Sequence, residues 1–329
     1  MILKSETVDH RGRMLTVALV DAPTEDVRRL MDGRQWGSPG GLLYRNKTTQ
    51  WDRIDVPRIG TVHDADGRLL AAVVFSQLPW GTYLAAVTVL PEQTRQGLAS
   101  LLVGRTADWI VELGGPDHPI TGLVVGDNTA ALEALFAGGV EIGAKVDALM
   151  YSRVRTRTSS DCRAMRPQDR DEVLTALTAL NRGWQDADTT LMEDEYYICV
   201  EGGRIVAGMQ AVTQRLAVEA LGTPIDPFAM WALPKLLGVT AEDFRFLMMF
   251  HVFGSAPALD RLCSHVLSEQ GLKLACLQLD REDPVRETFV TGVRPGLGAR
   301  LTGVDKMLIF ASGDIPRPMS VTPLMGTFS

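Results

Sequence analysis

The chain has 329 residues and a formal net charge of −7 at pH 7. This length suggests two domains of ordinary size, and the acidic balance disfavours a general nucleic-acid or anionic-membrane binder. The first residues lack the apolar core of a signal peptide, and no uninterrupted apolar stretch reaches about 18 residues, the length typical of a membrane span. We therefore expect a cytoplasmic protein that neither binds nucleic acid nor enters a membrane.

The cysteines and histidines indicate no metal centre. Cys162, Cys199, Cys263 and Cys276 lie in apolar runs and form no CxxC pair, so we expect buried, reduced thiols. The five histidines are scattered without HxxxH or HxH spacing, and no metal site is expected from them.

The first half alternates strand and helix patterns. A strand is predicted over residues 15–20, a helix over 25–31 and an irregular segment over 33–57. A hairpin follows, with its turn at residues 64–67. Its strands are predicted over 58–63 and 69–75. The remaining elements of this half are predicted as strand, helix, strand, helix and strand over 83–90, 99–113, 120–125, 129–136 and 148–154.

After a polar linker predicted at residues 155–161, the same order of elements returns. A second hairpin with the sequence VEGGRIVAGMQ matches DADGRLLAAVV of the first, which indicates a weak internal repeat. Residues 216–245 are predicted as an inserted loop with a short helix. The other elements of this half are predicted over 162–165, 167–180, 196–200, 205–211, 246–253, 258–268, 272–279, 283–290 and 306–311. We predict an α/β fold with domains over residues 1–154 and 162–315 and a tail over 316–329.

The segment that carries chemistry joins the predicted strand 83–90 to the helix that follows it. An apolar strand runs into Pro91, and a turn with Gly97 and Ala99 opens the helix. Backbone N–H groups in the first turn of a helix have no partner within that helix, and the helix dipole favours negative charge there. Gly97 permits close approach of a ligand, and Arg95 adds a positive charge. The segment therefore predicts a binding site for a diphosphate, although a plain strand-to-helix connection gives a similar pattern.

These residues resemble the GNAT acetyltransferase superfamily. Its V-x-P strand end is matched by Val89-Leu90-Pro91, and its [QR]-x-x-G-x-[GA] motif by residues 94–99, with Thr94 in place of the leading Gln or Arg. The resemblance implies a bound acetyl-CoA, or another acyl-CoA. The cofactor-binding residues that it implies are Val87, Val89, Thr94, Arg95, Gln96, Gly97, Leu98, Ala99, Ser100 and Asn128.

A second family motif, N-x-x-A-x-x-x-Y followed by G-F, is matched by Asn128, Ala131 and Gly139. Leu135 occupies the position of the family tyrosine, which often protonates the leaving thiolate of coenzyme A, so this proton must come from another group or from water. The second half resembles the family in layout only, because residues 253–257 lack the residues that would build a diphosphate-binding turn. The resemblance implies two tandem GNAT-like domains, the second degenerate, each with a mixed, mostly antiparallel central sheet flanked by helices.

The resemblance implies an N-acetyltransferase in which a primary amine of a small molecule attacks the thioester directly. Tyr83 stands where some members carry an acidic residue, and it could relay a proton or simply pack. Trp36, Tyr44 and Trp51 lie in the segment that would line the acceptor pocket, or they pack a long loop.

Two alternatives to this function stay open at this point, and so does the oligomeric state. The acyl group could be longer or of the malonyl type. The domain could bind acyl-CoA without catalysis, as a regulatory protein, which Leu135 motivates. The oligomeric state is undetermined, and a homodimer is one option.

Overall fold

The computed structural model describes the whole chain except residues 33, 38–42, 47–50, 52–56, 79, 116, 127, 129–130, 134–139, 181–194, 221–230, 232–237, 295, 297–304 and 316–329. Its strands are β1 (Ile2–His10), β2 (Arg13–Val20), β3 (Trp36–Gly37), β4 (Leu43–Asn46), β5 (Arg58–His63), β6 (Leu69–Leu78), β7 (Gly81–Val89), β8 (Ile120–Val125), β9 (Glu141–Ser152), β10 (Cys162–Ala164), β11 (Tyr196–Glu201), β12 (Arg204–Ala220), β13 (Phe244–Gly254), β14 (Leu274–Asp280) and β15 (Asp305–Ala311). Its helices are α1 (Glu25–Asp32), α2 (Leu98–Gly114), α4 (Arg170–Leu180), α7 (Ala256–Glu269) and α8 (Pro284–Gly292), with 3-10 turns η2 (Pro91–Gln93) and η3 (Pro167–Asp169). Among these described helices, none has the length and hydropathy of a membrane span.

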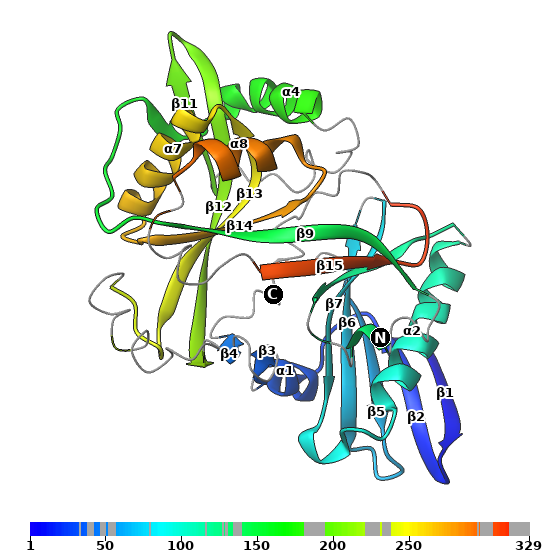
Figure 1. Ribbon diagram of the computed structural model, residues 1–329. Coiled ribbons are helices and arrows are strands. Elements are labelled where there is room, and N and C mark those ends of the chain that lie inside the picture. The colour runs from blue at the N-terminus through cyan, green and yellow to red at the C-terminus, as the bar shows by residue number, and fades with distance from the viewer. Residues whose placement is uncertain are drawn as a thin grey trace.

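One 15-stranded sheet joins the described strands (Figure 1). Its order is β1-β2-β5-β6-β7-β8-β15-β9-β14-β13-β12-β11-β10, with β4 pairing to β12 and β3 to β4. The described pairs are antiparallel except β7 with β8 and β13 with β14, which are parallel. Helices flank this mixed, mostly antiparallel sheet, and the predicted α/β fold class is confirmed.

The two halves repeat one order of elements. The first half runs β5, β6, β7, α2 and β8, and the second runs β11, β12, β13, α7 and β14. Each contains an antiparallel hairpin, then a strand that enters a helix, then a strand parallel to the one before that helix. The chain therefore carries two tandem GNAT-like halves, as the sequence predicted.

The halves are joined by two exchanged strands. The last strand, β15, inserts between β8 and β9 and pairs antiparallel with both. In turn β9, which closes the first half along the chain, pairs with β14 of the second half. Figure 1 shows β9 and β15 lying side by side across the middle of the molecule. Neither half thus completes its sheet from its own residues.

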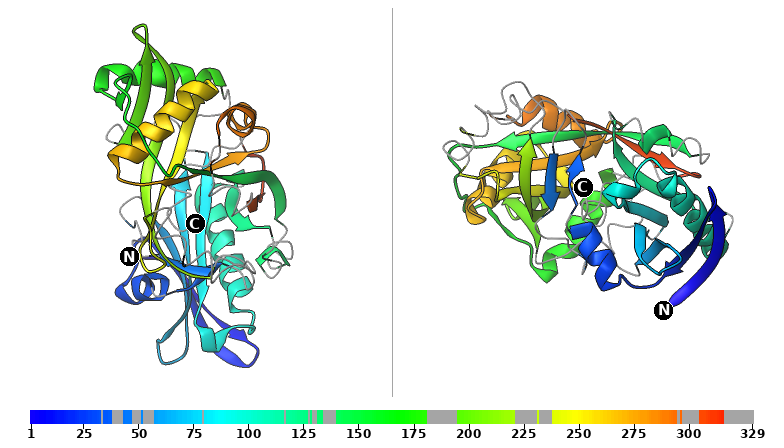
Figure 2. Two further views of the ribbon diagram at one scale, coloured as in Figure 1. Left: turned by 60° about the vertical axis from the view of Figure 1, so that its left-hand side comes forward. Right: turned by 90° about the horizontal axis from the view of Figure 1, so that it is seen from below.

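Helices cover both faces of the sheet in the first half, and alternate side chains of β6 pack against them. Val73 and Phe75 of β6 pack in the cluster that includes α2, whereas Ala72 and Val74 pack in the cluster that includes α1. Because successive side chains of a strand point to opposite faces, the two helices cover opposite faces of this sheet. The two views in Figure 2 agree with that arrangement.

Three segments differ from the sequence prediction. Residues 2–10, for which no element was predicted, form β1 and pair with β2 along its length. The segment 33–57, predicted as irregular, contributes β3 and β4. Residues 216–220, assigned to an inserted loop, instead extend β12 and pair with β4, so the first half's loop docks onto a strand of the second. Alternation in these exposed or short strands is too weak to identify them without their partners.

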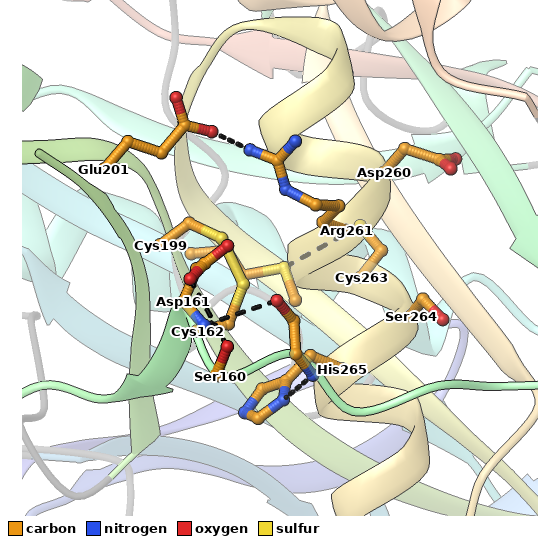
Figure 3. Close-up of a disulfide and its surroundings, with 12 residues drawn as sticks. Ser160, Asp161, Cys162, Cys199, Glu201, Asp260, Arg261, Cys263, Ser264 and His265 are labelled. Carbon is orange, nitrogen blue, oxygen red and sulfur yellow. Dashed lines mark hydrogen bonds and ion pairs between the residues drawn. A yellow bond between two sulfur atoms is a disulfide. The ribbon is translucent and has the colours of Figure 1, made fainter.

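The expectation of reduced cysteines is wrong for one pair. Cys162 of β10 and Cys199 of β11 stand directly opposite each other in the strand register and form a disulfide (Figure 3). Cys263 and Cys276 are free and buried, as expected. The pairing arises from the register between two strands, which the spacing of the cysteines along the chain does not indicate. Figure 3 places this disulfide beside α7, close to Cys263.

Candidate functional site

The predicted cradle is a tight bend between β7 and α2. Pro91 opens the 3-10 turn η2, in which Gln93 N–H donates to the carbonyl of Leu90 at 2.9 Å. Arg95 and Gly97 then adopt left-handed conformations, with φ of 62° and 78°. Glycine tolerates this region without a Cβ penalty, and Gly97 serves as the N-terminal cap residue of α2. The two left-handed residues turn the chain sharply into the helix.

The amides of this bend are unpaired. The first bond within α2 runs from the N–H of Leu101 to the carbonyl of Gly97, at 3.0 Å. The N–H groups of residues 95–100 donate to no acceptor in the part of the chain that the structure describes. Free amides at the positive end of a helix dipole favour an anion.

The strand that leads into the bend has an open edge. Its parallel pairing with β8 extends only from Thr82 to Leu84, and a register irregularity against β6 follows at Ala85. Leu90 N–H donates to the carbonyl of Leu70 on β6 at 2.9 Å. Alternation along an antiparallel ladder then directs the backbone groups of Val87 and Val89 away from β6. They face the wedge that opens where β7 and β8 separate.

A basic hairpin tip, which sequence reasoning missed, lies against the same bend. His10 Nε2 is 2.7 Å from the carbonyl oxygen of Gln96, and Arg13 Nη1 donates to the side-chain oxygens of Gln93 and Gln96, at 3.0 and 2.8 Å. A Cβ placed on Gly97 would stand 3.5 Å from the guanidinium of Arg11. These residues come from the turn between β1 and β2, and only the pairing of β1 brings them here.

Arg11 and Arg95 are two cations of this region whose side chains contact no described acceptor. Neither forms an ion pair or a side-chain hydrogen bond with any described residue, whereas the nearby Arg68 pairs with Glu92. Both are exposed, and both hold positive φ, which is unfavourable for a long side chain. The bend thus combines free amides with two unpaired positive charges.

Tyr83 lies on β7 just before the bulge and is almost fully buried. Burial raises the pKa of its hydroxyl, the neighbouring Tyr44 raises it further, and a hydrogen bond with the backbone of Leu123 lowers it in part. A phenol with a raised pKa stays protonated at neutral pH and is a poor base. Tyr83 can donate a hydrogen bond at the base of the wedge.

The three aromatic residues predicted for the acceptor pocket are brought toward β7. Trp36 and Trp51 pack in the cluster that contains Ala85 and Ala86 of β7. Tyr44 lies opposite Trp36 in the β3–β4 pair, and burial raises its pKa to about 12. The segment therefore lies beside the wedge.

Asn128 caps the helical turn that follows β8. Its side-chain oxygen accepts the N–H of Ala131 at 3.2 Å, a cap geometry that explains why asparagine stands there. The predicted positions Leu135, Phe136 and Gly139 lie outside the described residues. Among the described residues, no group of three His, Cys, Asp or Glu side chains could hold a metal ion.

The second half lacks the bend. Its strand β13 ends at Gly254, and α7 begins two residues later, with Pro257 in its first turn and therefore one N–H fewer. The β13 bulge carries His251, with φ of 48°, and burial lowers the pKa of this histidine to about 4. Its carbonyl accepts the hydroxyl of Tyr196 at 2.8 Å. His251 is thus a neutral core residue, in keeping with the second half as a support.

Comparisons with known proteins found a family model and structures of similar fold. Residues 28–136 match the model of the acetyltransferase (GNAT) family. An N-myristoyltransferase from Saccharomyces cerevisiae with bound myristoyl-CoA aligns with a TM-score of 0.54 at 9% identity, over 92% of this chain and 84% of that one. A GCN5-related N-acetyltransferase from Sphaerobacter thermophilus aligns with a TM-score of 0.45 at 15% identity, over 80% of this chain and 81% of that one. No curated protein matches the sequence.

The family match covers α1 through β8, the elements that build the bend, the open strand edge and the aromatic segment. The structural likeness to the N-myristoyltransferase extends over both halves. Residues 28–136 therefore form a domain of the GNAT acetyltransferase family, within a chain of two tandem GNAT-like halves.

Proposed function

We propose that the first half binds an acyl-CoA and transfers its acyl group to a primary amine of a small molecule. One observation carries this proposal: the unpaired amides of residues 95–100 lie at the end of a strand whose own edge is open toward the same bend. A phosphate-binding concavity that continues into an open strand edge suits a ligand with a diphosphate and an extended, amide-containing arm.

The bend fits the diphosphate in charge as well as shape. Its free N–H groups and the helix dipole favour an anion, and Arg11 and Arg95 offer charges that no described carboxylate neutralises. A longer side chain at Gly97 would extend beside Arg11 and His10, since even a Cβ there would stand 3.5 Å from both. In a chain of net charge −7, such a local basic site is needed to attract a polyanionic ligand.

The open edge of β7 fits the pantetheine arm. Backbone N–H and C=O groups of Val87 and Val89 face the wedge, where they can pair with the amides of an extended ligand as an added strand would. The arm would then run from the bend toward the bulge at Ala85, so that its sulfur end lies beside Tyr83.

When bound, acyl-CoA would supply an activated thioester carbonyl at the bulge. A C–N bond to the amine forms as the C–S bond breaks, and the proton that the amine loses passes through water to the leaving thiolate. Backbone N–H groups on the open edge of β7 can polarise the carbonyl in this wedge. We assign Tyr83, which remains protonated, as the candidate hydrogen-bond donor to the leaving sulfur, a role that Leu135 cannot fill.

We further propose that the acyl group is short, with acetyl-CoA as the donor. Tyr83 is buried in a cluster that includes Leu78, Val146 and Ile309, and this cluster fills the core behind the bulge. A long chain would have to displace those side chains, at a cost that close packing makes large.

A thiol-release assay combined with calorimetry tests the proposal. We expect acetyl-CoA to bind, and we expect thiol release that requires both acetyl-CoA and a primary amine from a panel of small molecules. Malonyl-CoA and myristoyl-CoA serve as comparison donors. Absence of acyl-CoA binding would overturn the proposal.

A regulatory acyl-CoA-binding protein is the second candidate, and Leu135 at the position of the family tyrosine is the observation that favours it. Tight binding of every donor without thiol release from any amine in the same assay would establish this candidate and exclude transfer.

A further inference from the structure

Two buried hydrogen-bond donors between α1 and β4 lack an acceptor. The Nη1 atom of Arg34 and the Nε1 atom of Trp36 are both buried, and neither has a hydrogen-bond partner in the described structure. The guanidinium of Arg34 lies over the Trp36 ring, with Cζ 5.6 Å from the ring centroid. The two unsatisfied donors therefore belong to one stacked pair.

The acidic groups around this pair are engaged elsewhere. Glu219 forms an ion pair with Arg45 at 2.6 Å and accepts a hydrogen bond from the side chain of Gln35. Asp32 accepts the indole N–H of Trp51 at 3.4 Å. No ion pair joins Arg34 to any described residue, and burial lowers the pKa of its guanidinium with no acidic group opposing that effect.

An arginine in this position needs a partner that the described residues do not provide. Burying a charge without an opposite charge is costly, and an unsatisfied buried donor adds to the cost. The stacking on Trp36 offsets part of it, yet stacking uses the ring face and leaves the edge N–H groups free. A ligand with anionic oxygen atoms would satisfy both donors at once.

The pair lies where an acceptor substrate would bind. Trp36 packs in the cluster that contains Ala85, the bulge residue of β7. It also stands opposite Tyr44, which is close enough to Tyr83 to raise the pKa of that residue. Figure 1 places α1, β3 and β4 at the junction of the two halves.

We propose that Arg34 and Trp36 bind a carboxylate of the acyl-accepting substrate, which makes that substrate an amino acid or a related amine that carries an acid group. This proposal rests on the proposed transfer to an amine. The unpaired cation of the pair contributes one positive charge, which a carboxylate balances, whereas a dianionic phosphate would keep an uncompensated charge. The Arg34 fork and the indole N–H can each donate to one carboxylate oxygen.

The test compares carboxylate acceptors with their neutral analogues. Probes are the common L-amino acids and 4-aminobutyrate, each matched with its carboxamide, and the readouts are kcat and KM of thiol release. For the wild type we expect turnover of at least one carboxylate and a KM about 10- to 100-fold lower than for its carboxamide, the range of a charge-assisted hydrogen bond.

Four variants identify the residues responsible. Arg34→Gln removes the charge, and we expect it to raise the KM of the carboxylate to that of the carboxamide with kcat nearly unchanged. Arg34→Lys restores part of the preference, and Trp36→Phe, which keeps the ring but loses the N–H, weakens it severalfold. Arg29→Gln is the control, because Arg29 is an exposed cation of α1 that pairs with Glu25 and Asp26.

A second measurement does not depend on turnover. Calorimetry with the same probes on the protein saturated with CoA should show carboxylate binding that Arg34→Gln abolishes. Chemical denaturation of the ligand-free protein should show no loss of stability in Arg34→Gln, because an unpaired buried charge is removed. A large loss of stability would indicate a structural role and contradict the proposal.

Equal use of carboxylates and carboxamides by the wild type would overturn the inference, as would a carboxylate preference that survives Arg34→Gln. The absence of binding by any carboxylate probe would also overturn it. Failure of the proposed function looks different, because the wild type would then bind no acyl-CoA or release no thiol with any amine, charged or neutral.

Discussion

At the scale of single residues, two unfavourable backbone conformations lie beside the proposed cofactor site. Three described residues other than glycine have positive φ, namely Arg11, Arg95 and His251. Two of them are unpaired cations beside the same bend. Backbone conformations that cost energy persist where the surroundings or a function require them. Arg11 stands in the turn between β1 and β2, where Asn is the residue that tolerates this conformation best.

Replacing Arg11 with Asn tests its part in cofactor binding. Asn suits the left-handed turn, so the hairpin is retained while the charge is removed. We expect calorimetry to show an acetyl-CoA affinity about tenfold weaker than that of the wild type. Lys4→Asn on β1, remote from the tip, is the control and should leave the affinity unchanged. Equal affinities for wild type and Arg11→Asn would remove Arg11 from the site.

At the scale of elements, β7 and β13 each carry a bulge, but the surroundings of the two bulges differ. In β7 the bulge precedes an open edge and a long bend, whereas in β13 it holds His251 in the core. The pKa of His251 is about 4 in the folded protein, because burial disfavours its charged form, and its usual value is 6.5. Its contribution to stability is therefore complete above pH 6.5 and is lost as the pH falls from 6.5 toward 4.

His251→Asn isolates this effect, because Asn tolerates the positive φ and does not titrate. Between pH 6.5 and 4, we expect the free energy of unfolding of the wild type to fall by roughly 3 kcal/mol more than that of the variant. Urea denaturation at several pH values measures the difference. Parallel curves for the two proteins would show that His251 is not the buried neutral group described.

Some of these elements could be predicted from the sequence alone, and others could not. The strand and helix patterns around the bend were correct to within a few residues, because β5–β8 and α2 carry strong periodicity and clear turn residues. The β1 strand alternates exposed and half-buried positions and has no fully buried residue, so its pattern was too weak to recognise. The Arg11 tip, the β4–β12 pair and the Cys162–Cys199 disulfide depend on contacts between distant segments, and no local pattern encodes them.

At the scale of the whole molecule, charged contacts as well as strands join the two halves. Asp147 of β9 is almost fully buried. Its carboxylate oxygens form ion pairs with Arg281 Nε at 2.9 Å and Arg286 Nη2 at 2.6 Å, both from the second half. Burial alone would raise the pKa of Asp147, but hydrogen bonds from Arg286 and Arg281 outweigh it and hold that pKa below its usual value. Because β9 also pairs with β15 and β14, the halves should unfold together.

Asp147→Ala should destabilise the whole chain by roughly 2–3 kcal/mol, because it leaves two partly buried arginines without their ion-pair partner. We expect one cooperative denaturation transition at a lower midpoint, followed by both near-ultraviolet circular dichroism and fluorescence. Asp26→Ala, which removes an exposed partner of Arg29, is the control and should change stability by less than about 0.5 kcal/mol. Two separate transitions would contradict the shared sheet.

The proposed function requires that residues 95–100 bind the diphosphate of the cofactor, and acetyl-CoA titration of Gly97→Glu tests this requirement. The glutamate would place a side chain and a negative charge at the free amides, so we expect at least a hundredfold weaker binding, roughly 2.7 kcal/mol. Gly203→Glu matches the conformational strain, with φ of 81° against 78°, and stands in open space, so it should bind as the wild type does. Wild-type affinity in a folded Gly97→Glu protein would contradict the account.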